Sequence, residues 1–212
     1  MPKVLVLIPS FNEKSSIIKI LKKIKHDVVV LDDFSSDGTL KLIKSIKKDK
    51  LKIISNKKNH GYEKNLLNGF KKIIKKNFEY VITFDADGEH DTRDIMRIEK
   101  YLIKNDVDML IGVRSKKNRL EEKVVSFFFK LFFSVEDPLS GFKAYKIKKL
   151  KKIINEIKYN YFLVDIIRIF KKRNYRIDTL NINSKKLKKR IPRIGNNFFV
   201  RLKILKCIGL LI

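Results

Sequence analysis

The sequence predicts an α/β fold, in which a mainly parallel, Rossmann-like sheet is flanked by helices. Short apolar runs rich in Val and Ile alternate with longer stretches of helical spacing along the first half of the chain. The connections between successive apolar runs are long enough for crossover helices, which parallel strands require. No internal repeat interrupts this alternation. We therefore expect one sheet built from strand–helix–strand units.

Five apolar runs in the first half predict strands, because each is short and is followed by turn-forming residues. They span residues 3–8, 28–31, 51–54, 80–84 and 107–111. Between them apolar residues recur at helical spacing, as Ile17, Ile20 and Leu21 do after the first run. The helices predicted in this way span residues 15–24, 39–47, 62–76 and 91–103.

The pattern changes after Gly112. Residues 124–135 are apolar except for Ser126, Lys130 and Ser134, which recur every four residues and predict a helix with a narrow polar stripe. A helix of this length reaches only about 18 Å, whereas the hydrocarbon core of a bilayer is roughly 30 Å thick. This helix is therefore too short to cross a membrane, and it either lies on a membrane surface or packs in the core.

The last part of the chain predicts a few more elements and a basic tail. The elements are helices near 148–157 and 163–172 and a strand over 175–182. In the tail, residues 198–212, Arg201, Lys203 and Lys206 lie among large apolar residues. Basic residues beside an apolar face suit an anionic bilayer surface, although a solvated basic face has the same composition. Both interpretations stay open.

The composition limits the partners and the compartment. The chain of 212 residues can bury one sizeable core, and its 50 Lys and Arg against 23 Asp and Glu give a net charge of +27. Such a charge predicts a polyanionic partner, whether nucleic acid, an anionic membrane surface or a phosphorylated substrate. The single Cys207 excludes an intramolecular disulfide. The first residues do not have the pattern of a signal peptide. No apolar run approaches the roughly 20 residues of a membrane span. We expect a cytoplasmic protein.

The fourth apolar run ends in four acids and a histidine, of which Asp85 and Asp87 come first. Ligands bind outside the carboxyl ends of the strands in open α/β sheets, so these acids fall where a site is expected. Two carboxylates beside the turn-forming Gly88 predict a site for Mg²⁺ or Mn²⁺, which take hard oxygen ligands and share the phosphates of a substrate. A solvated acidic turn has the same residues, and only the neighbouring loops can decide between the two.

Polar side chains also follow the other predicted strands of the first half. They lie in residues 9–13, 32–37 and 59–61 and at Arg114. Because the carboxyl ends of parallel strands meet at one edge of a sheet, we expect these loops to form a single cleft with the acids. Asp32 and Asp33 suit a polar ring or a ribose, and a metal at Asp87 suits phosphates. The chain has no glycine-rich phosphate-binding motif, so metal, Lys and Arg must neutralise a diphosphate, which then becomes a good leaving group.

Six segments carry a resemblance to a known family. They are Pro-Ser-Phe-Asn-Glu at 9–13, Leu-Asp-Asp-Phe-Ser-Ser-Asp-Gly-Thr at 31–39, Asn-His-Gly-Tyr-Glu-Lys-Asn-Leu-Leu-Asn-Gly at 59–69, Phe-Asp-Ala-Asp-Gly-Glu-His-Asp at 84–91, Ile-Gly-Val-Arg at 111–114 and Asp-Pro-Leu-Ser-Gly-Phe-Lys at 137–143. In this order they resemble the motifs of family 2 glycosyltransferases. The resemblance is closest to the dolichyl- or polyprenyl-phosphate sugar transferases, such as the dolichol-phosphate mannosyltransferases, which have the GT-A fold. It covers residues 3 to about 195.

The resemblance implies an inverting transfer of a sugar from a GDP- or UDP-sugar to a polyprenyl or dolichyl phosphate, with Mg²⁺ or Mn²⁺ as the cofactor. It implies a protein held peripherally at the cytoplasmic, anionic face of a membrane. It also implies a GT-A domain over 1–195, with the nucleotide sugar bound by 1–112 and the acceptor by 113–195. A basic amphipathic tail, 196–212, would follow.

The resemblance further assigns roles to single residues, motif by motif. The positions implied to bind the nucleotide sugar are Pro9, Phe11, Glu13, Asp32, Asp33, Lys64, Asp85, Asp87, Glu89 and Arg193. The positions implied to hold the metal are Asp85, Asp87 and Glu89, and those implied to bind the acceptor are Arg114, Asp137 and Ser140. Catalysis would depend on Asp85, Asp87 and Arg114.

A few positions depart from the lipid-phosphate branch. Glu89 stands where that branch commonly has Gln, Phe11 replaces a frequent Tyr, and Lys143 replaces a frequent Arg. The segment after Arg193 lacks the usual Ser-Lys, and the chain has neither the Gln-x-x-Arg-Trp of processive synthases nor any Trp. Synthesis of a polymer is therefore not expected.

Two alternatives stay open at this point. A soluble family 2 transferase acting on a saccharide or protein hydroxyl would need a general base, and Asp91, Glu89 or His90 would be the candidates. A phosphate acceptor, which is already an anion, needs little such help. A nucleic-acid-binding protein would also fit the charge of +27, but the basic residues are spread along the chain and no base-reading motif is present, so no nucleic-acid partner is expected.

Overall fold

The computed structural model describes residues 3–115, 120–158, 161–185, 205–206 and 208–210. Within these residues the centre of the molecule is a seven-stranded sheet in the order β3-β2-β1-β4-β6-β5-β7. Neighbouring strands are parallel except where β6 is one of the pair. The strands are β1 (Val4–Ser10), β2 (Asp27–Asp32), β3 (Leu51–Ser55), β4 (Tyr80–Thr83), β5 (Met109–Arg114), β6 (Lys143–Lys146) and β7 (Ile177–Ile182). The predicted mainly parallel sheet is confirmed.

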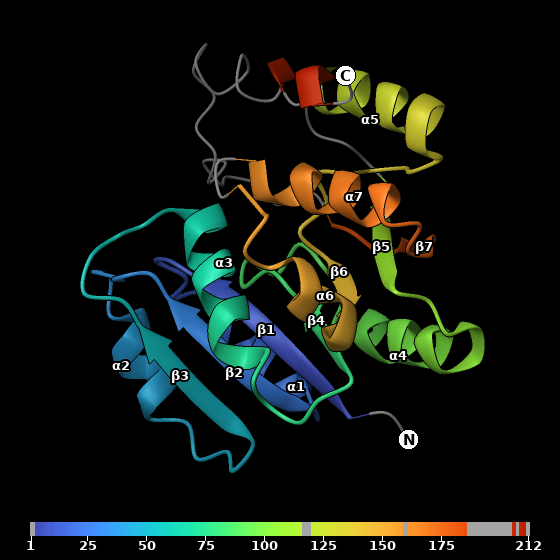
Figure 1. The fold of residues 1–212 in the computed structure, drawn as a ribbon. Helices are drawn as coiled ribbons and strands as arrows, with labels where there is room; N and C mark the ends of the chain where they lie inside the picture. The colour runs from blue at the N-terminus through green and yellow to red at the C-terminus, as the bar shows by residue number, and fades with distance from the viewer. Residues whose placement is uncertain (1–2, 116–119, 159–160, 186–204, 207, 211–212) are drawn as a thin grey trace.

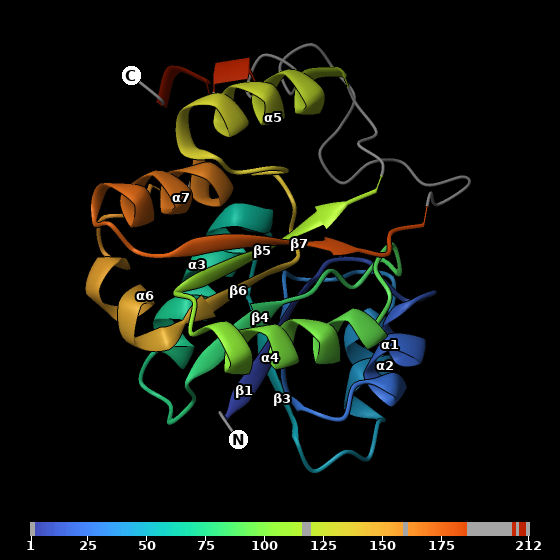
Figure 2. The ribbon, with the colours of Figure 1, turned by 90° about the vertical axis from the view of Figure 1, so that its right-hand side faces the viewer.

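Helices cover both faces of this sheet, as Figures 1 and 2 show. One face packs against α1 (Ile17–Lys23), α2 (Thr39–Lys44) and α4 (Arg93–Asn105). The other face packs against α3 (Tyr62–Ile73), α6 (Ile147–Ile153) and α7 (Phe162–Lys172). Helix α5 (Leu120–Phe133) lies beyond α7, next to the 3-10 turn η2 (Ile208–Leu210).

The apolar strands are buried on both faces, which explains why they read as continuous apolar runs. In β1, Val4 and Val6 pack toward α1 and α4, whereas Leu5 and Leu7 pack toward α3, α6 and α7. All seven residues of β1 are buried, because the strand lies near the middle of the sheet between β2 and β4. The sheet is therefore a rigid platform for the loops that follow its strands.

The strand that the sequence did not reveal is β6. Its four residues, for which the sequence analysis predicted no strand, pair antiparallel with both β4 and β5. A strand of this length that begins and ends in Lys gives no periodic signal. The other predicted strands and helices are present, with ends that move by a few residues.

The polar stripe predicted on α5 does not lie on one solvent-exposed face, because Lys130 and Ser134 are exposed but Ser126 is not. Ser126 is buried, whereas Phe127, Leu131 and Phe132 are each more than 60% exposed. The inner face is anchored by Val125 and Phe129, which belong to the core cluster under α7. Most of the predicted tail, together with Arg193, lies outside the described residues. Among the described helices none combines the length and apolarity needed to cross a bilayer.

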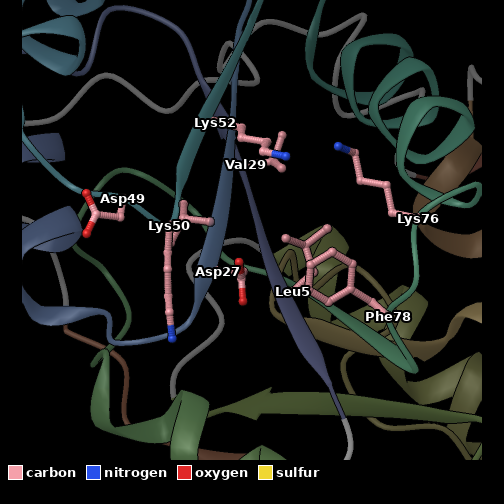
Figure 3. A pocket seen from close by; sticks show the side chains of 9 residues that line it. Leu5, Asp27, Val29, Asp49, Lys50, Lys52, Lys76 and Phe78 are labelled. Atoms are coloured by element: carbon pink, nitrogen blue, oxygen red, sulfur yellow. The ribbon is translucent and has the colours of Figure 1, made fainter.

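The two ends of the sheet differ in character. At the amino ends of the strands, Leu5, Val29, Lys52 and Phe78 are among the residues that line a small hollow (Figure 3). At the carboxyl ends lie the loops in which the sequence analysis placed the acids and Arg114. The candidate site is therefore at the edge that the fold class predicts.

Candidate active site

The loops after β1 and β2 are joined into one unit by hydrogen bonds. The amide of Asn12 donates to Ser35 Oγ at 3.0 Å, and the amide of Ser36 donates to Asn12 Oδ1 at 2.9 Å. The amide of Glu13 donates to Thr39 Oγ1 at 2.8 Å. Asn12 has a φ of 55°, a left-handed conformation that Asn tolerates better than most residues. These contacts hold the double loop in one geometry.

Two aromatic side chains are exposed on this double loop. Phe11 is 40% exposed and Phe34 is 55% exposed. Phe34 has a φ of 67°, a conformation that is costly for a bulky residue and that persists only where the surroundings enforce it. Apolar ring faces therefore stand beside the polar groups at the carboxyl ends of β1 and β2.

Asp32 and Asp33 are both buried, but their carboxylates make different hydrogen bonds. Asp33 accepts hydrogen bonds from the amides of His60 and Gly61 and from the Asn56 side chain, at 2.8–3.1 Å, and so fixes the loop that precedes α3. Asp32 accepts from Ser35 through Oδ2, while its Oδ1 is buried with no hydrogen-bond partner among the described residues, and the same holds for the hydroxyl of Ser10 on the adjacent strand. A buried carboxylate oxygen without a donor is costly, so Asp32 is suited to receive a donor from a ligand.

The acidic segment after β4 forms a tight turn. Asp87 Oδ1 accepts from the amide of Glu89 at 2.9 Å, and Gly88 between them has a φ of 82°, which glycine adopts without strain. Ser16 at the start of α1 donates to the carbonyl of Ala86 at 2.6 Å and anchors the turn. Asp85, Asp87 and Glu89 are all partly exposed. The three carboxylates are thus presented on a fixed backbone.

Asp85 is enclosed by His90 of its own segment and by residues from two other segments. The hydroxyl of Tyr62, the first residue of α3, donates to Asp85 Oδ1 at 3.0 Å. His90 Nε2 lies 3.8 Å from Asp85 Oδ2. Gly141 lies so close that a Cβ there would collide with Asp85 Oδ2 and would approach the Tyr62 hydroxyl to 2.7 Å. The loop 137–141 therefore closes directly over the acidic turn.

Arg114, at the end of β5, is bound by two carboxylates. Its Nε and Nη2 donate to the two oxygens of Asp137, each at 2.8 Å, and its amide donates to Asp137 Oδ2 at 3.0 Å. Nη2 also donates to Glu122 of α5 at 3.2 Å. Burial alone would lower the pKa of Arg114, but Asp137, Glu122 and Glu89 raise it above its usual value. The guanidinium is therefore permanently charged and largely neutralised.

Lys143 is completely buried behind this pair. Its ammonium donates to the carbonyls of Pro138 and Ser140 at 2.7 and 2.8 Å and to that of Leu163 in α7 at 3.3 Å. Burial lowers the pKa of Lys143 to about 7, against the opposing effect of Asp137. Lys143 thus ties β6, the loop 137–141 and α7 together.

The candidate bases differ in their acidity. Burial, reinforced by Asp87 and Asp85 and opposed by Arg114, raises the pKa of Glu89 to about 7. The hydrogen bonds from Arg93 lower the pKa of Asp91 to about 2, which makes Asp91 a weak base. Burial lowers the pKa of His90, although Asp85 opposes the shift. Of the three, Glu89 has the acidity closest to that of a general base at neutral pH.

The structure brings most of the predicted site residues to one edge of the sheet. Asp85, Asp87, Glu89, Arg114 and Asp137 interact electrostatically within a single cluster. Other predicted residues lie at the edge of the site or make local hydrogen bonds there. Pro9 is a buried residue of β1, Glu13 is buried where it accepts from Ser16, Lys64 is exposed on the first turn of α3, and Ser140 is buried with its hydroxyl accepting from the Phe142 amide.

Three residues of the site were given no role in it by the sequence analysis, although Tyr62 and Lys143 lie in two of the six segments that carry the resemblance. Tyr62 directly follows the Asn-His-Gly turn at the end of β3, a position that could have marked it. Glu122 lies in a stretch of mixed charge that gives no signal, and the burial of Lys143 goes against the usual exposure of lysine.

The carboxylates suit a divalent cation that is shared with a ligand. Within the described residues no group of three or more His, Cys, Asp or Glu side chains is arranged as a metal-holding cluster. Asp85 and Asp87 nevertheless provide hard oxygen donors on a fixed turn, and Mg²⁺ is commonly bound by one or two carboxylates together with substrate phosphates and water. The donor set therefore fits Mg²⁺ or Mn²⁺ once a diphosphate supplies the remaining oxygens.

Comparison with known proteins gives consistent matches. Residues 5–134 match the family described as Glycosyl transferase family 2. The chain is 24% identical to the UDP-N-acetylglucosamine–dolichyl-phosphate N-acetylglucosaminyltransferase of Methanococcus voltae, over 95% of each protein. It is 27% identical to the dolichol-phosphate mannosyltransferase of Pyrococcus furiosus, over 74% of this chain and 49% of that enzyme. The chain thus spans about half of the Pyrococcus enzyme.

Solved structures show the same fold. Glucosyl-3-phosphoglycerate synthase from Mycobacterium tuberculosis, in complex with Mn²⁺, UDP-glucose and phosphoglyceric acid, superposes with a TM-score of 0.71 at 16% identity. The superposition covers 98% of this chain and 80% of that enzyme. Structures of the same synthase hold UDP with either Mn²⁺ or Mg²⁺. At this identity the likeness shows the GT-A fold.

Proposed function

The chain belongs to glycosyl transferase family 2 and is a glycosyltransferase, and we propose that it moves a sugar from a nucleotide-sugar donor to a polyprenyl phosphate. The observation that carries this proposal is the cluster at the sheet edge. There the acidic turn 85–89 lies against the loop 137–141 and the Arg114–Asp137 pair. Groups suited to a metal diphosphate are thus adjacent to a cation suited to a phosphate.

The donor's nucleoside is proposed to bind at the double loop after β1 and β2. The unpartnered Oδ1 of Asp32 would accept a hydrogen bond from the base or ribose, and the exposed ring of Phe11 would cover an apolar face. Asp33 contributes indirectly, because its oxygens already hold the loop before α3. Asp33 is therefore a positioning residue in this proposal.

The diphosphate is proposed to bind at the acidic turn, with Asp87 and Asp85 as ligands of Mg²⁺ or Mn²⁺. When bound, the cation would take up the negative charge that develops on the leaving diphosphate. Tyr62 and Gly141 fix the position of Asp85. Glu89 lies next to this pair and would adjust the charge that the cation meets.

The acceptor is proposed to present its phosphate near Arg114. An oxygen of the acceptor phosphate would form a bond to the anomeric carbon as the bond from that carbon to the nucleoside diphosphate breaks, with inversion. The acceptor oxygen is already anionic, so no proton has to be removed by a base. This chemistry agrees with the dolichyl-phosphate acceptors named for the relatives from Methanococcus voltae and Pyrococcus furiosus.

Helix α5 is proposed to lie on the membrane that holds the lipid acceptor. Phe127, Leu131 and Phe132 are exposed on this helix, and Lys123 and Lys130 are exposed as well. Large apolar side chains flanked by lysines fit the boundary of an anionic bilayer, where the rings enter the acyl region and the ammonium groups meet lipid phosphates. The replacement of Phe127, Leu131 and Phe132 by Ser should abolish flotation with anionic liposomes without lowering the melting temperature.

The direct test of the proposed chemistry is Asp87→Ala. We expect this variant to lose metal-dependent transfer to farnesyl phosphate, a short polyprenyl phosphate, by about 10²–10³-fold, because charge on the leaving group is no longer stabilised. Asp49→Asn, at the opposite end of the sheet, is the control and should keep full activity. Full activity of Asp87→Ala would overturn the proposed role of the acidic turn.

A further inference from the structure

The carboxylate of Glu122 occupies one of the hydrogen-bond donors of Arg114. Arg114 Nη2 is shared between Asp137 Oδ1 at 2.8 Å and Glu122 Oε2 at 3.2 Å. Both side chains of the Arg114–Glu122 pair are nearly buried, with 10% and 13% exposure. Charge-assisted hydrogen bonds in such surroundings are strong, so occupation of Nη2 by Glu122 matters for what else can bind there.

The two carboxylates on Arg114 are not equivalent. Asp137 is completely buried and accepts from the amide, Nε and Nη2 of Arg114, which makes it a fixed partner. Glu122 makes one longer bond, and within the part of the chain that the structure describes Arg114 is its sole hydrogen-bond donor. Glu122 is therefore the partner that an incoming anion can replace at the lower cost.

The charge balance favours such a replacement. The described residues around Arg114 include more acids than bases. The acids are Asp85, Asp87, Glu89, Glu122 and Asp137, and the bases are Arg114 and Lys143. A phosphate that arrives beside this cluster is repelled unless negative charge leaves. Movement of the Glu122 carboxylate into solvent removes one such charge and frees one donor of Arg114.

The position of Glu122 in the chain gives this movement a consequence. Glu122 lies on the first turn of α5, while the exposed Phe127, Leu131 and Phe132 lie on later turns of the same helix. Docking of α5 on a bilayer and release of Glu122 from Arg114 therefore involve one rigid element. The first turn of α5 carries Glu122, and the hydrogen bond of Glu122 connects this end of the helix to Arg114.

We infer that Glu122 occupies, in the free protein, the place that the acceptor's phosphate takes on Arg114, and that it acts as a displaceable latch. This inference rests on the proposed function, in which the acceptor is a phosphate monoester. The latch keeps Arg114 neutralised until a phosphate-bearing lipid arrives and discriminates against uncharged polyprenols, which have no charge with which to displace a carboxylate.

The test compares the binding of farnesyl phosphate and farnesol by the full chain in detergent, using calorimetry. Glu122→Gln should bind farnesyl phosphate about tenfold more tightly than wild type, a difference that corresponds to about 1.4 kcal/mol. Farnesol binding should not change. With saturating donor, the KM for farnesyl phosphate should fall while kcat stays nearly constant, because the latch acts on binding alone.

Two further variants separate the latch from other effects. Glu136→Gln removes an equal charge near the other end of α5, where Glu136 pairs with Lys130 in an exposed contact, and should leave the affinity unchanged. Glu122→Asp keeps the charge but shortens the side chain, and should bind farnesyl phosphate with an intermediate affinity. It provides the test if Glu122→Gln fails to fold.

The outcomes distinguish this inference from the proposed function. Equal affinities of wild type and Glu122→Gln for farnesyl phosphate, or a weaker affinity of the variant, would overturn the latch alone. An equal gain in affinity in Glu136→Gln would show that the gain comes from the change in net charge, and it would also overturn the latch. If none of the proteins binds farnesyl phosphate, the latch and the proposed acceptor both fail.

Discussion

The donor side and the acceptor side of the site are organised by different forces. On the donor side, the loops after β1 and β2 are held mainly by backbone amides that donate to side-chain oxygens, as in the contacts of Asp33 and Asn12. On the acceptor side, Arg114, Asp137, Glu122 and Lys143 form a nearly buried set of charges. The two sides meet where Gly141 lies against Asp85.

This difference has an energetic meaning. A hydrogen bond from a backbone amide contributes about 0.5–1.5 kcal/mol, and several of them together make a rigid template for a ligand. Buried ion pairs contribute little net stability because desolvation offsets their attraction, yet the loss of one partner leaves an uncompensated charge. The donor side is therefore suited to a fixed nucleoside, and the acceptor side to an exchange of anions.

The largest effect should come from Asp137→Asn. This variant removes the stronger of the two ion pairs that the described residues make with the buried guanidinium of Arg114, and it should lower the free energy of unfolding by about 3–5 kcal/mol. Asp33→Asn on the donor side should cost less, about 1–3 kcal/mol, because its partners are neutral N–H groups. Urea denaturation of both variants measures the difference, and equal losses would erase the distinction between the two sides.

The second effect concerns the pH dependence of stability. Burial lowers the pKa of Lys143 to about 7, so between pH 7 and about 10 the unfolded chain binds more protons than the folded one. Stability should therefore rise with pH across this window, by on the order of 2–4 kcal/mol from this group, and should be lowest below pH 7. Lys143→Met should lack this rise, whereas Lys44→Met, an exposed lysine of α2, should retain it. Denaturation curves at pH 7, 8.5 and 9.5 measure the free energy of unfolding of each variant. The same change with pH in wild type and in Lys143→Met would contradict a lowered pKa of Lys143.

A third comparison uses two glycines. In Gly141→Ala the new Cβ collides with Asp85 Oδ2, so kcat/KM should fall by about 10²-fold as the carboxylate is displaced. In Gly38→Ala on the donor side the Cβ has open space, but a φ of 89° strains alanine by about 1–2 kcal/mol. Activity should fall mainly in the first variant and stability mainly in the second. The reverse pattern in transfer assays and melting curves would contradict the contact between the two sides.

The smallest effect should come from Tyr62→Phe. The loss of one hydrogen bond to Asp85 should lower kcat/KM by about 3–10-fold, because the bond orients the carboxylate without contacting substrate. Tyr101→Phe removes a similar hydroxyl from a bond to Asp178, away from the site, and should leave kcat/KM unchanged. A change of the same size in both variants would indicate a general effect on stability instead.

The fold was largely predictable because it follows from periodicity. Strands buried on both faces produce continuous apolar runs, and α4 has its buried Ile95, Ile98 and Leu102 at helical spacing. Helix α5 could not be oriented in this way, since nearly all of its sides are apolar and Ser126 turned out to be buried. The outward position of Phe127 and Leu131 depends on which side packs against the core, which is a tertiary property.

The site was predictable as a place but not as a set of partners. The position of Asp85 and Asp87 at a strand end follows from the topology of parallel sheets. Arg114 pairs with Asp137, which is 23 positions away in the sequence, and with Glu122, which is 8 positions away. No local sequence pattern predicts these pairs. The assignment of Arg193 lies outside the described residues and stays a prediction.

The most direct test of the proposed function is a transfer assay with a panel of labelled GDP- and UDP-sugars. Each donor is offered farnesyl phosphate or farnesol, with Mn²⁺ or with EDTA, and the products are separated by chromatography. The structure and the family lead us to expect product from farnesyl phosphate alone and only when Mn²⁺ is present. Transfer to farnesol at a comparable rate, or an undiminished rate in EDTA, would contradict metal-dependent transfer to a lipid phosphate.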